Sequence, residues 1–65
     1  MKTDYNIVRM REVKILTGLS KATIYRKIAK NQFPKQVSLG ERIVGWLDTD
    51  IQKWILDRPY KEGLA

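Results

Sequence analysis

Residues 17–25 read Thr17-Gly18-Leu19-Ser20-Lys21-Ala22-Thr23-Ile24-Tyr25. Gly18 suits the left-handed conformation that ends a helix, and Ser20 suits the N-cap of a following helix, because its hydroxyl can accept from the first free amides. Leu19 lies between them as an apolar plug. The stretch therefore predicts two short helices joined by a glycine turn, which is the arrangement of a helix-turn-helix.

The helix predicted from Ser20 to about Lys30 has two different faces. At about 100° per residue, Ile24 and Ile28 lie on one side, with Tyr25 at its margin. Opposite them lie cationic and hydroxyl side chains at the spacing i, i+3, i+4, i+7, namely Thr23, Arg26, Lys27 and Lys30. No acid interrupts this stripe, whereas solvated helix faces usually mix charges of both signs. The stripe favours contact with a polyanion and fits a recognition helix in the DNA major groove.

The charge of the whole chain supports the same interpretation. The chain has 65 residues and a formal net charge of +6. Residues 20–42 carry six cations and one acid, whereas residues 1–19 sum to +2 and residues 43–65 to −1. Such a local excess is the electrostatic footprint expected of a nucleic-acid-binding domain.

Composition excludes several other classes of protein. The chain has no cysteine and no histidine, so disulfides, zinc-finger ligand sets and pairs of a nucleophile with an imidazole are excluded. We expect no enzyme activity, no metal or other cofactor, and no small-molecule ligand. No apolar run approaches the ~20 residues of a membrane span, and the N-terminus lacks the apolar core of a signal peptide. A soluble, cytoplasmic protein that does not enter membranes is expected.

The chain divides into one folded domain, residues 9–58, between an N-terminal arm, residues 1–8, and a C-terminal tail, residues 59–65. Within the arm, Ile7 and Val8 are compatible with a short strand or with simple packing on the core. No repeat or low-complexity segment is present. We expect a single core.

Two of the predicted helices flank the glycine turn. The first spans Met10–Thr17, with Val13 and Leu16 facing inward, although no Ser, Thr, Asp or Asn precedes it as a cap. The second is expected to end at Asn31, which tolerates the left-handed conformation. Pro34 bars its continuation.

A third helix is predicted from about Asp48 to Arg58. Its cap is Asp48 itself or Thr49, the latter in a capping box with Gln52. Acids at a helix start complement the dipole, so Asp48 and Asp50 are not interpreted as a catalytic pair. Pro59 stops the helix, and its inner stripe consists of Leu47, Ile51, Trp54 and Ile55.

Residues 36–46 are predicted to form a β-hairpin, because apolar and polar residues alternate on both of its sides. Gly40-Glu41 is the expected two-residue turn. The resulting strand pairs are Val37 with Val44 and Leu39 with Arg42. This register puts four apolar side chains on the face that covers the helices, Val37, Leu39, Val44 and Trp46. Arg42 then lies beside a hairpin tip next to a cationic helix, as in the wing of a winged helix-turn-helix.

Other side chains of the second helix have two uses each. Lys21 lies nearer the core side than the cationic stripe, but from the first turn it can reach a phosphate. Ser20 serves as cap or phosphate ligand. Ala22 fits close approach to DNA or a thymine methyl contact, and equally fits helix propensity. Tyr25 packs its ring inward while its hydroxyl is available to a phosphate.

Four further apolar residues separate into two groups. Trp46, like Tyr25, could be a stacking platform for bases, but it falls on an apolar face, so we interpret it as a core residue. Trp54 is interpreted as a core residue as well. Ile43 and Leu56 fall outside the core by register and by helical wheel. Exposed apolar residues are a weak indication of a protein partner.

Together these residues resemble the AlpA family of small prophage regulators, which is related to phage excisionases and more distantly to MerR-type winged helices. The matching residues are Val13-x-x-Leu16-Thr17-Gly18-Leu19-Ser20-Lys21-x-Thr23-Ile24-Tyr25, then Phe33-Pro34-Lys35, Leu39-Gly40-x-Arg42-x-Val44-Gly45-Trp46 and Trp54-Ile55. The resemblance implies a DNA-binding transcriptional activator, or a factor that steers an integrase toward excision. It assigns Ser20, Lys21, Thr23, Tyr25 and Arg26 to the recognition helix, and Gly40 and Arg42 to the wing. The chain departs from the family at Ala22, often a small polar residue, and at Asn31, usually glycine.

We therefore predict a mainly α protein with a small β-hairpin, a winged helix-turn-helix of three short helices plus a two-stranded wing. Helix 20–30 is expected in the major groove of double-stranded DNA, and the wing 36–46 on the backbone or the adjacent minor groove. The expected DNA-binding residues are Ser20, Lys21, Ala22, Thr23, Tyr25, Arg26, Lys27, Lys30, Lys35, Gly40 and Arg42. One such domain covers a short site, so copies along the DNA or a partner such as an integrase are expected.

Two alternatives remain open from the sequence. One is an excisionase that acts with an integrase. The other belongs to a different class of protein, an interaction module whose basic face meets an acidic protein, in which Ile43 and Leu56 would be central.

Overall fold

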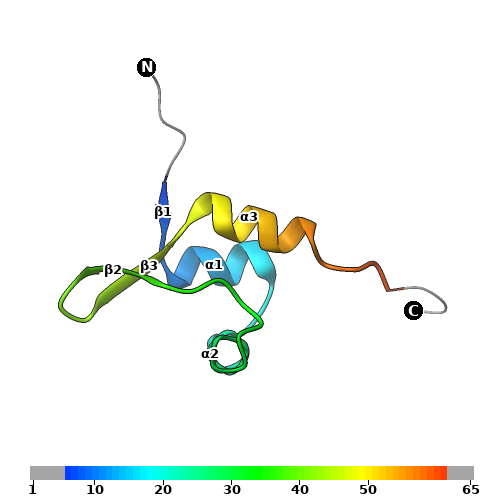
Figure 1. Cartoon of the computed structure of the whole chain (residues 1–65), viewed down its shortest axis with the longest axis horizontal. Coiled ribbons are helices and arrows are strands. Elements are labelled where there is room, and N and C mark those ends of the chain that lie inside the picture. Colours follow the sequence, from blue (N-terminus) through cyan, green and yellow to red (C-terminus); the bar gives the residue numbers. More distant parts are fainter. Residues whose placement is uncertain (1–5, 62–65) are drawn as a thin grey trace, which may run out of the picture.

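The computed structural model describes residues 6–61. Within them, three helices and three strands form a winged helix-turn-helix (Figure 1). In chain order these are β1 (Ile7–Val8), α1 (Met10–Thr17), α2 (Lys21–Ala29), β2 (Val37–Gly40), β3 (Ile43–Leu47) and α3 (Asp48–Leu56). The predicted fold is confirmed, with β1 as an additional strand of the sheet.

The turn between α1 and α2 is built from local hydrogen bonds, as the sequence predicts. Gly18 has a φ of 74°, and its N–H donates to the Lys14 carbonyl at 2.8 Å. Two residues later, the Ser20 hydroxyl accepts from the Thr23 N–H at 3.2 Å. These caps satisfy backbone groups that a helix end otherwise leaves without partners. The relative direction of α1 and α2 is therefore set within a few residues.

The start of α1 has no side chain at the N-cap that accepts a hydrogen bond, and a carboxylate from the first turn stabilises it instead. The Arg9 N–H donates to a carboxylate oxygen of Glu12 at 3.0 Å, which is one half of a capping box. Val13 has no exposed area. Leu16, which we expected to face inward, is 42% exposed, and that prediction is wrong. Leu19, just beyond the turn, packs against the core instead.

The sheet has the order β1-β3-β2, with β3 in the centre. β1 pairs antiparallel with β3, Ile7 opposite Leu47 and Val8 opposite Trp46. β2 also pairs antiparallel with β3, with the partners Val37 and Gly45, Ser38 and Val44, and Gly40 and Ile43. An irregularity between Ser38 and Gly40 leaves Leu39 as an extra residue.

This register contradicts the predicted hairpin. The two residues between the strands are Glu41 and Arg42, not Gly40 and Glu41, and Arg42 takes the left-handed conformation with a φ of 61°. The turn is displaced by one residue because Leu39 is an extra residue in β2 and Arg42 adopts the left-handed conformation. On its other side β3 lies close to β1, since a Cβ placed on Gly45 would lie 2.7 Å from Ile7 Cγ2 and 2.9 Å from the Val8 carbonyl oxygen.

The register also decides which side chains face the core. Opposed residues share a face and successive residues alternate, so Val44 and Trp46 face the helices as predicted. Val37 is opposite Gly45 and therefore lies on the other face. The Cδ1 atom of Leu39 would lie 3.3 Å from a Cβ on Gly45, so Leu39 lies on that face too. Their predicted inward orientation is wrong.

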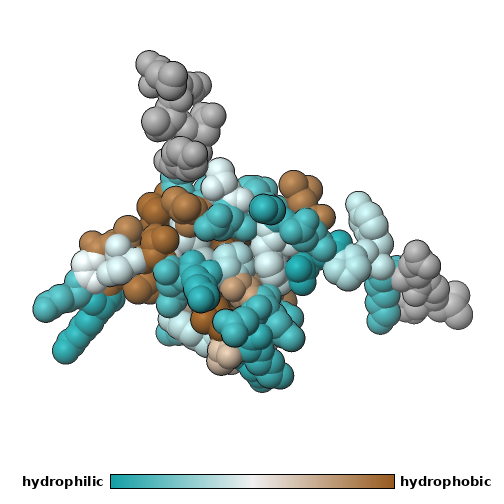
Figure 2. All heavy atoms as spheres, viewed as in Figure 1, coloured by the Kyte–Doolittle hydropathy of each residue, from teal (hydrophilic) through white to brown (hydrophobic). Residues whose placement is uncertain are grey.

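Three exposed side chains define an outer-sheet patch. They are Ile7, Leu39 and Ile43, which are 39%, 44% and 43% exposed. Apolar side chains gather over β1 and the hairpin at the left of Figure 2. Ile43 was predicted outside the core, and Leu56 of α3 is also outside, at 81% exposed. Both predictions are confirmed.

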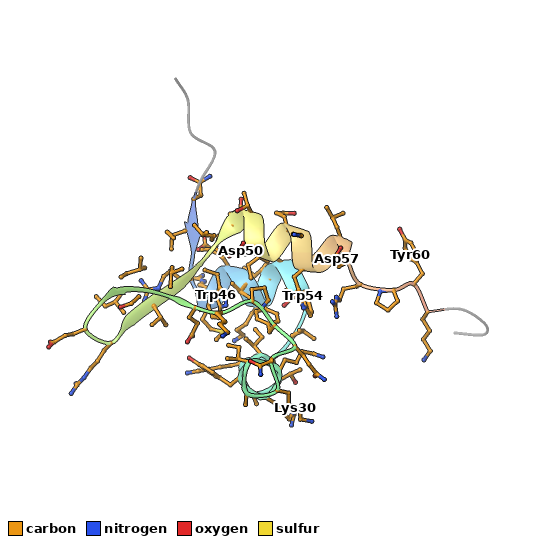
Figure 3. The ribbon with its side chains drawn as sticks, viewed as in Figure 1. Lys30, Trp46, Asp50, Trp54, Asp57 and Tyr60 are labelled. Carbon is orange, nitrogen blue, oxygen red and sulfur yellow. The ribbon has the colours of Figure 1, made fainter. Side chains whose placement is uncertain are left out.

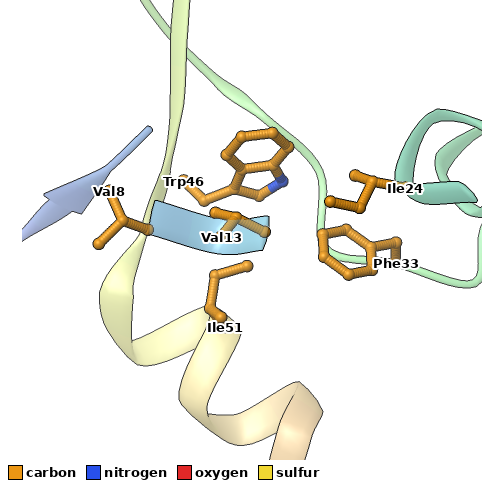
Figure 4. Close-up of a cluster of buried hydrophobic side chains, with 6 residues drawn as sticks. All are labelled: Val8, Val13, Ile24, Phe33, Trp46 and Ile51. Atoms are coloured by element: carbon orange, nitrogen blue, oxygen red, sulfur yellow. The ribbon is translucent and has the colours of Figure 1, made fainter. Parts of the chain in front are cut away.

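Six buried side chains from every layer form the core (Figure 4), Val8, Val13, Ile24, Phe33, Trp46 and Ile51. Trp46 has no exposed area, as predicted for a core residue. Trp54 packs against this core but stays half-buried. All buried residues among those described are apolar, and the indole N–H of Trp46, a polar group within this core, has a backbone carbonyl as its partner.

Two indoles hold the connection between α2 and β2. The Trp46 Nε1–H donates to the Pro34 carbonyl, and the Trp54 Nε1–H donates to the Gln32 carbonyl, both at 3.0 Å. Phe33 lies beside both rings, with centroid distances of 6.2 Å to Trp46 and 4.7 Å to Trp54. This clamp fixes where α2 ends and where β2 begins.

α3 follows β3 without a connecting loop. Leu47 occupies the N-cap position, and it offers no side-chain acceptor. The predicted caps, Asp48 and Thr49, are therefore wrong. The reason is a tertiary contact, because the Asp48 N–H donates to the Asn6 carbonyl at 2.7 Å. The Asp48 carboxylate instead accepts from the Gln52 amide at 3.4 Å.

Candidate nucleic-acid interface

A chain of hydrogen bonds follows the outer face of α2. The Ser20 hydroxyl donates to Thr23 Oγ1 at 3.0 Å, and Arg26 Nη2 donates to the same oxygen at 3.2 Å. Ser20, Thr23 and Arg26 recur every three residues, so they lie side by side on the helix surface. The guanidinium of Arg26 is thereby held along the helix toward its N-terminus.

The two sides of α2 match the predicted helical wheel. Ile24 has no exposed area, and Ile28 packs against the core. On the outer side, Arg26 and Lys30 are exposed, whereas Thr23 and Lys27 are half-buried. Lys21, Ala22 and Tyr25 are exposed as well. Figure 3 shows Lys30 on the side of α2 that faces away from α3.

The wing projects from the body of the molecule beside α2 (Figure 1). Its tip consists of Glu41 and Arg42, both exposed. A left-handed conformation is unfavourable for a residue with a Cβ, and Arg42 adopts it in the two-residue turn that joins β2 to β3. Gly40, expected in the turn, ends β2 with a φ of 156°.

A hollow of about 370 Å³ lies where the start of α1, the first turns of α2 and the wing meet. Six polar side chains line it, Arg9, Arg11, Lys21, Tyr25, Gln36 and Arg42. We call it the cationic hollow, because four of the six are cations and none of its lining residues is acidic. Three separate segments of the chain contribute these cations.

Sequence reasoning missed Arg9 and Arg11. They are two residues apart at the start of α1, so they form no stripe with a helical period. The only sequence signal was the modest excess of +2 over residues 1–19. It is the folding of the wing over the start of α1 that brings these cations beside Lys21 and Arg42.

A larger hollow of about 590 Å³ lies between α3 and the α2–β2 connection. Its lining has charges of both signs, including Asp50, Asp57, Lys53 and Arg58, and Figure 3 shows Asp50, Trp54 and Asp57 along α3. Lys35, which we predicted to bind DNA, lines this hollow and not the cationic one. Mixed charge gives the larger hollow no preference for a polyanion.

None of the helices within residues 6–61 has the length and apolarity needed to cross a membrane.

Comparison with known proteins gives a consistent result. The family described as prophage CP4-57 regulatory protein (AlpA) matches residues 6–59. An uncharacterized protein of Enterobacteria phage P4, ORF88, is 45% identical over 56 residues, a match covering 86% of this chain and 64% of the phage protein. The chain thus spans slightly less than two thirds of that relative.

A second relative is described by function. The DNA-binding transcriptional activator AlpA of Escherichia coli is 34% identical over 63 residues, a match covering 88% of this chain and 90% of the relative. The matched region of the family includes all three helices and the whole sheet. The chain belongs to the AlpA family of prophage regulatory proteins.

Proposed function

We propose that this protein is a transcriptional regulator that binds specific sequences of double-stranded DNA, with α2 in the major groove and the wing on the neighbouring backbone. The observation that carries the proposal is the outer face of α2, where Ser20, Thr23 and Arg26 are joined by hydrogen bonds beside the cationic hollow. The relative named as a DNA-binding transcriptional activator supports it.

Base recognition falls to the outer stripe of α2. Thr23, Arg26 and Lys27 lie nearest the base edges in this arrangement, and Ala22 allows close approach of the helix. A guanidinium can make two hydrogen bonds to guanine, which discriminates bases by about 1–3 kcal/mol. Because a hydrogen bond to Thr23 already restricts the orientation of the Arg26 side chain, Arg26 loses less conformational entropy when it binds DNA.

Phosphate contacts supply most of the affinity in this proposal. They come from Lys21, Lys30 and Lys35, and from Arg42 with the adjacent Gly40 of the wing. Ser20 and Tyr25 add hydroxyl donors near the start of α2. Because these contacts displace counterions from the DNA, affinity falls steeply as the salt concentration rises.

A titration with duplex DNA tests the proposal against a protein-binding role. Binding to a random duplex at low salt, followed at increasing salt, should show a strong linear dependence of log K on log salt. An interaction module for an acidic protein predicts little binding to DNA. Absence of binding at low salt would contradict the DNA-binding proposal.

Two substitutions then separate the roles of helix and wing. Arg42→Ala should weaken binding to all sequences and lower the salt slope by about one contact. Arg26→Ala should instead relax discrimination between sequences. If neither substitution changes binding, the assignment of this face is wrong.

The genetic role is tested by a footprint on the DNA that flanks the gene. Protection at a promoter supports a transcriptional regulator. Protection at an attachment site supports an excision factor that acts with an integrase, which is the second candidate because phage excisionases are related to this family.

We also propose that several copies, or a partner protein, act together on the DNA. A single small domain contacts only about 600–1,000 Å², and the outer-sheet patch leaves apolar surface uncovered on the side away from the helices. Analytical ultracentrifugation with and without a bound operator measures the number of copies. Tight binding of one copy to one short site would contradict this part of the proposal.

A further inference from the structure

We propose that the cationic hollow is a binding site for a backbone phosphate of DNA, and that Arg9, which precedes α1 as its N-cap, and Arg11 of α1 are its ligands together with Lys21 and Arg42. This inference rests on the proposed function and extends it, since it adds α1 to the two elements expected to touch DNA. The occupant is a phosphodiester group of the strand that passes between α2 and the wing.

Convergence of charge is the first argument. The four cations of the hollow come from the start of α1, the first turn of α2 and the tip of the wing, and all four are exposed. None of the residues that line the hollow is acidic. Like charges gathered around one concavity repel each other, and a bound anion offsets that repulsion because it attracts every one of the cations.

The direction of side chains on α2 is the second argument. Lys21 and Tyr25 are four residues apart, so they lie on one line of the helix surface, and both line the hollow. This explains why Lys21 lies off the cationic stripe in the helical wheel. α2 therefore presents two functional surfaces, the outer stripe toward base edges and the Lys21–Tyr25 line toward the backbone.

Uncharged donors complete the site. Tyr25 and Gln36 line the hollow, and the Gln36 Nε2, at the boundary with the larger hollow, is buried with no acceptor among the described residues. A buried donor without a partner is costly, and a phosphate oxygen supplies an acceptor after a rotation of the side chain. The first turn of α2, which contributes Lys21 to the hollow, carries no acid, unlike the first turns of α1 and α3.

The experiment compares two variants of α1 that remove positive charge at different places. Arg9→Gln/Arg11→Gln removes charge inside the hollow. Lys14→Gln is the matched control, because Lys14 is an exposed cation on the same helix outside the hollow. Anisotropy titrations with specific and random duplexes over a range of salt give the affinity and the salt slope, and circular dichroism melts check folding.

The double variant should lower the salt slope by up to about 0.9, the value for one lost phosphate contact, because both arginines contact the same phosphate. It should weaken binding to both duplexes by the same factor, because phosphates carry no sequence information. Lys14→Gln should leave the slope unchanged. Equal slopes for the two variants, or a slope of the double variant equal to that of the wild type, would overturn the inference while leaving the proposed function intact.

A second measurement locates the phosphate. Replacing single phosphates of the specific duplex by neutral methylphosphonates should weaken wild-type binding at several positions. At the one or two positions that occupy the hollow, the double variant should lose nothing further. A double variant equally sensitive to every position would overturn the inference. A wild type that binds no duplex at low salt would overturn the proposed function with it.

Discussion

Two regions of this protein differ in the interactions that form them. One is the indole clamp of Trp46, Trp54 and Phe33, and the other is the cationic face, which comprises the outer stripe of α2 and the cationic hollow. At the clamp, Trp46 and Trp54 each donate to a carbonyl at 3.0 Å, and Phe33 packs beside both rings. On the cationic face, exposed charges gather around a hollow, and the hydrogen bonds are short-range ones along one helix. One region gains stability from burial, whereas the other keeps charge ready for a ligand. Stability and binding should therefore respond to different substitutions.

The largest effect is expected at the clamp. Trp46→Ala removes a fully buried indole, and such truncations cost about 3–5 kcal/mol in the free energy of unfolding. A domain of this size rarely has more than about 3–5 kcal/mol in total, so the variant should be unfolded by circular dichroism at 25 °C. Trp54→Ala, which truncates a half-buried ring, should lose less and keep a cooperative transition in urea. A folded Trp46→Ala variant would contradict the view that the fold depends on this buried indole.

The next effect tests the close contact between β1 and β3. Gly45→Ala puts a Cβ against Ile7 and the Val8 carbonyl, so β1 must shift or detach. We expect a loss of about 1–3 kcal/mol, as for overpacked cores. Chemical denaturation measures it. Unchanged stability would show that β1 does not hold β3 in place.

The comparison also explains which elements the sequence could predict. The turn from α1 to α2 was predicted because its determinants are local, a left-handed Gly18 and a capping Ser20 within three residues. The cap of α3 was not predicted correctly, because the N–H of Asp48 at the start of α3 donates to the carbonyl of Asn6, more than forty residues away in the chain. The hairpin register was also predicted wrongly, because the extra residue at Leu39 and the left-handed Arg42 leave no signal in the alternation of apolar and polar residues.

The same distinction between local and distant determinants applies to the candidate site. The stripe of α2 has a helical period and could be predicted from the sequence, including the buried position of Ile24. The cationic hollow has no period, because Arg9, Lys21 and Arg42 come from three segments. Only the topology of the wing places them together, so α1 was absent from the predicted interface.

A third effect should fall on binding alone. Arg26→Ala removes an exposed side chain whose described hydrogen bond is to Thr23. The free energy of unfolding should stay within about 0.5 kcal/mol of the wild type, as for most surface substitutions. Discrimination between specific and random duplex should fall by about 1–3 kcal/mol, measured by competition titration. A loss of stability without a loss of discrimination would place Arg26 in the structural region instead.

The smallest effect should move stability and binding in opposite directions. Arg42 and Asn31 are the two non-glycine residues with positive φ in the described chain, at 61° and 58°. The left-handed conformation costs an L-residue roughly 1–2 kcal/mol. Glycine avoids this cost, but it loses more conformational entropy on folding, which cancels part of the gain. Arg42→Gly should therefore raise the free energy of unfolding by about 0.5 kcal/mol while weakening DNA binding and lowering its salt slope. Asn31→Gly is the control, because Asn31 has the same left-handed backbone conformation as Arg42 but carries no charge. It should change the free energy of unfolding less and should leave DNA binding unchanged. If Arg42→Gly lowered both quantities, the strained tip would contribute to the fold, and the separation between a stabilising core and a binding face would fail at the wing.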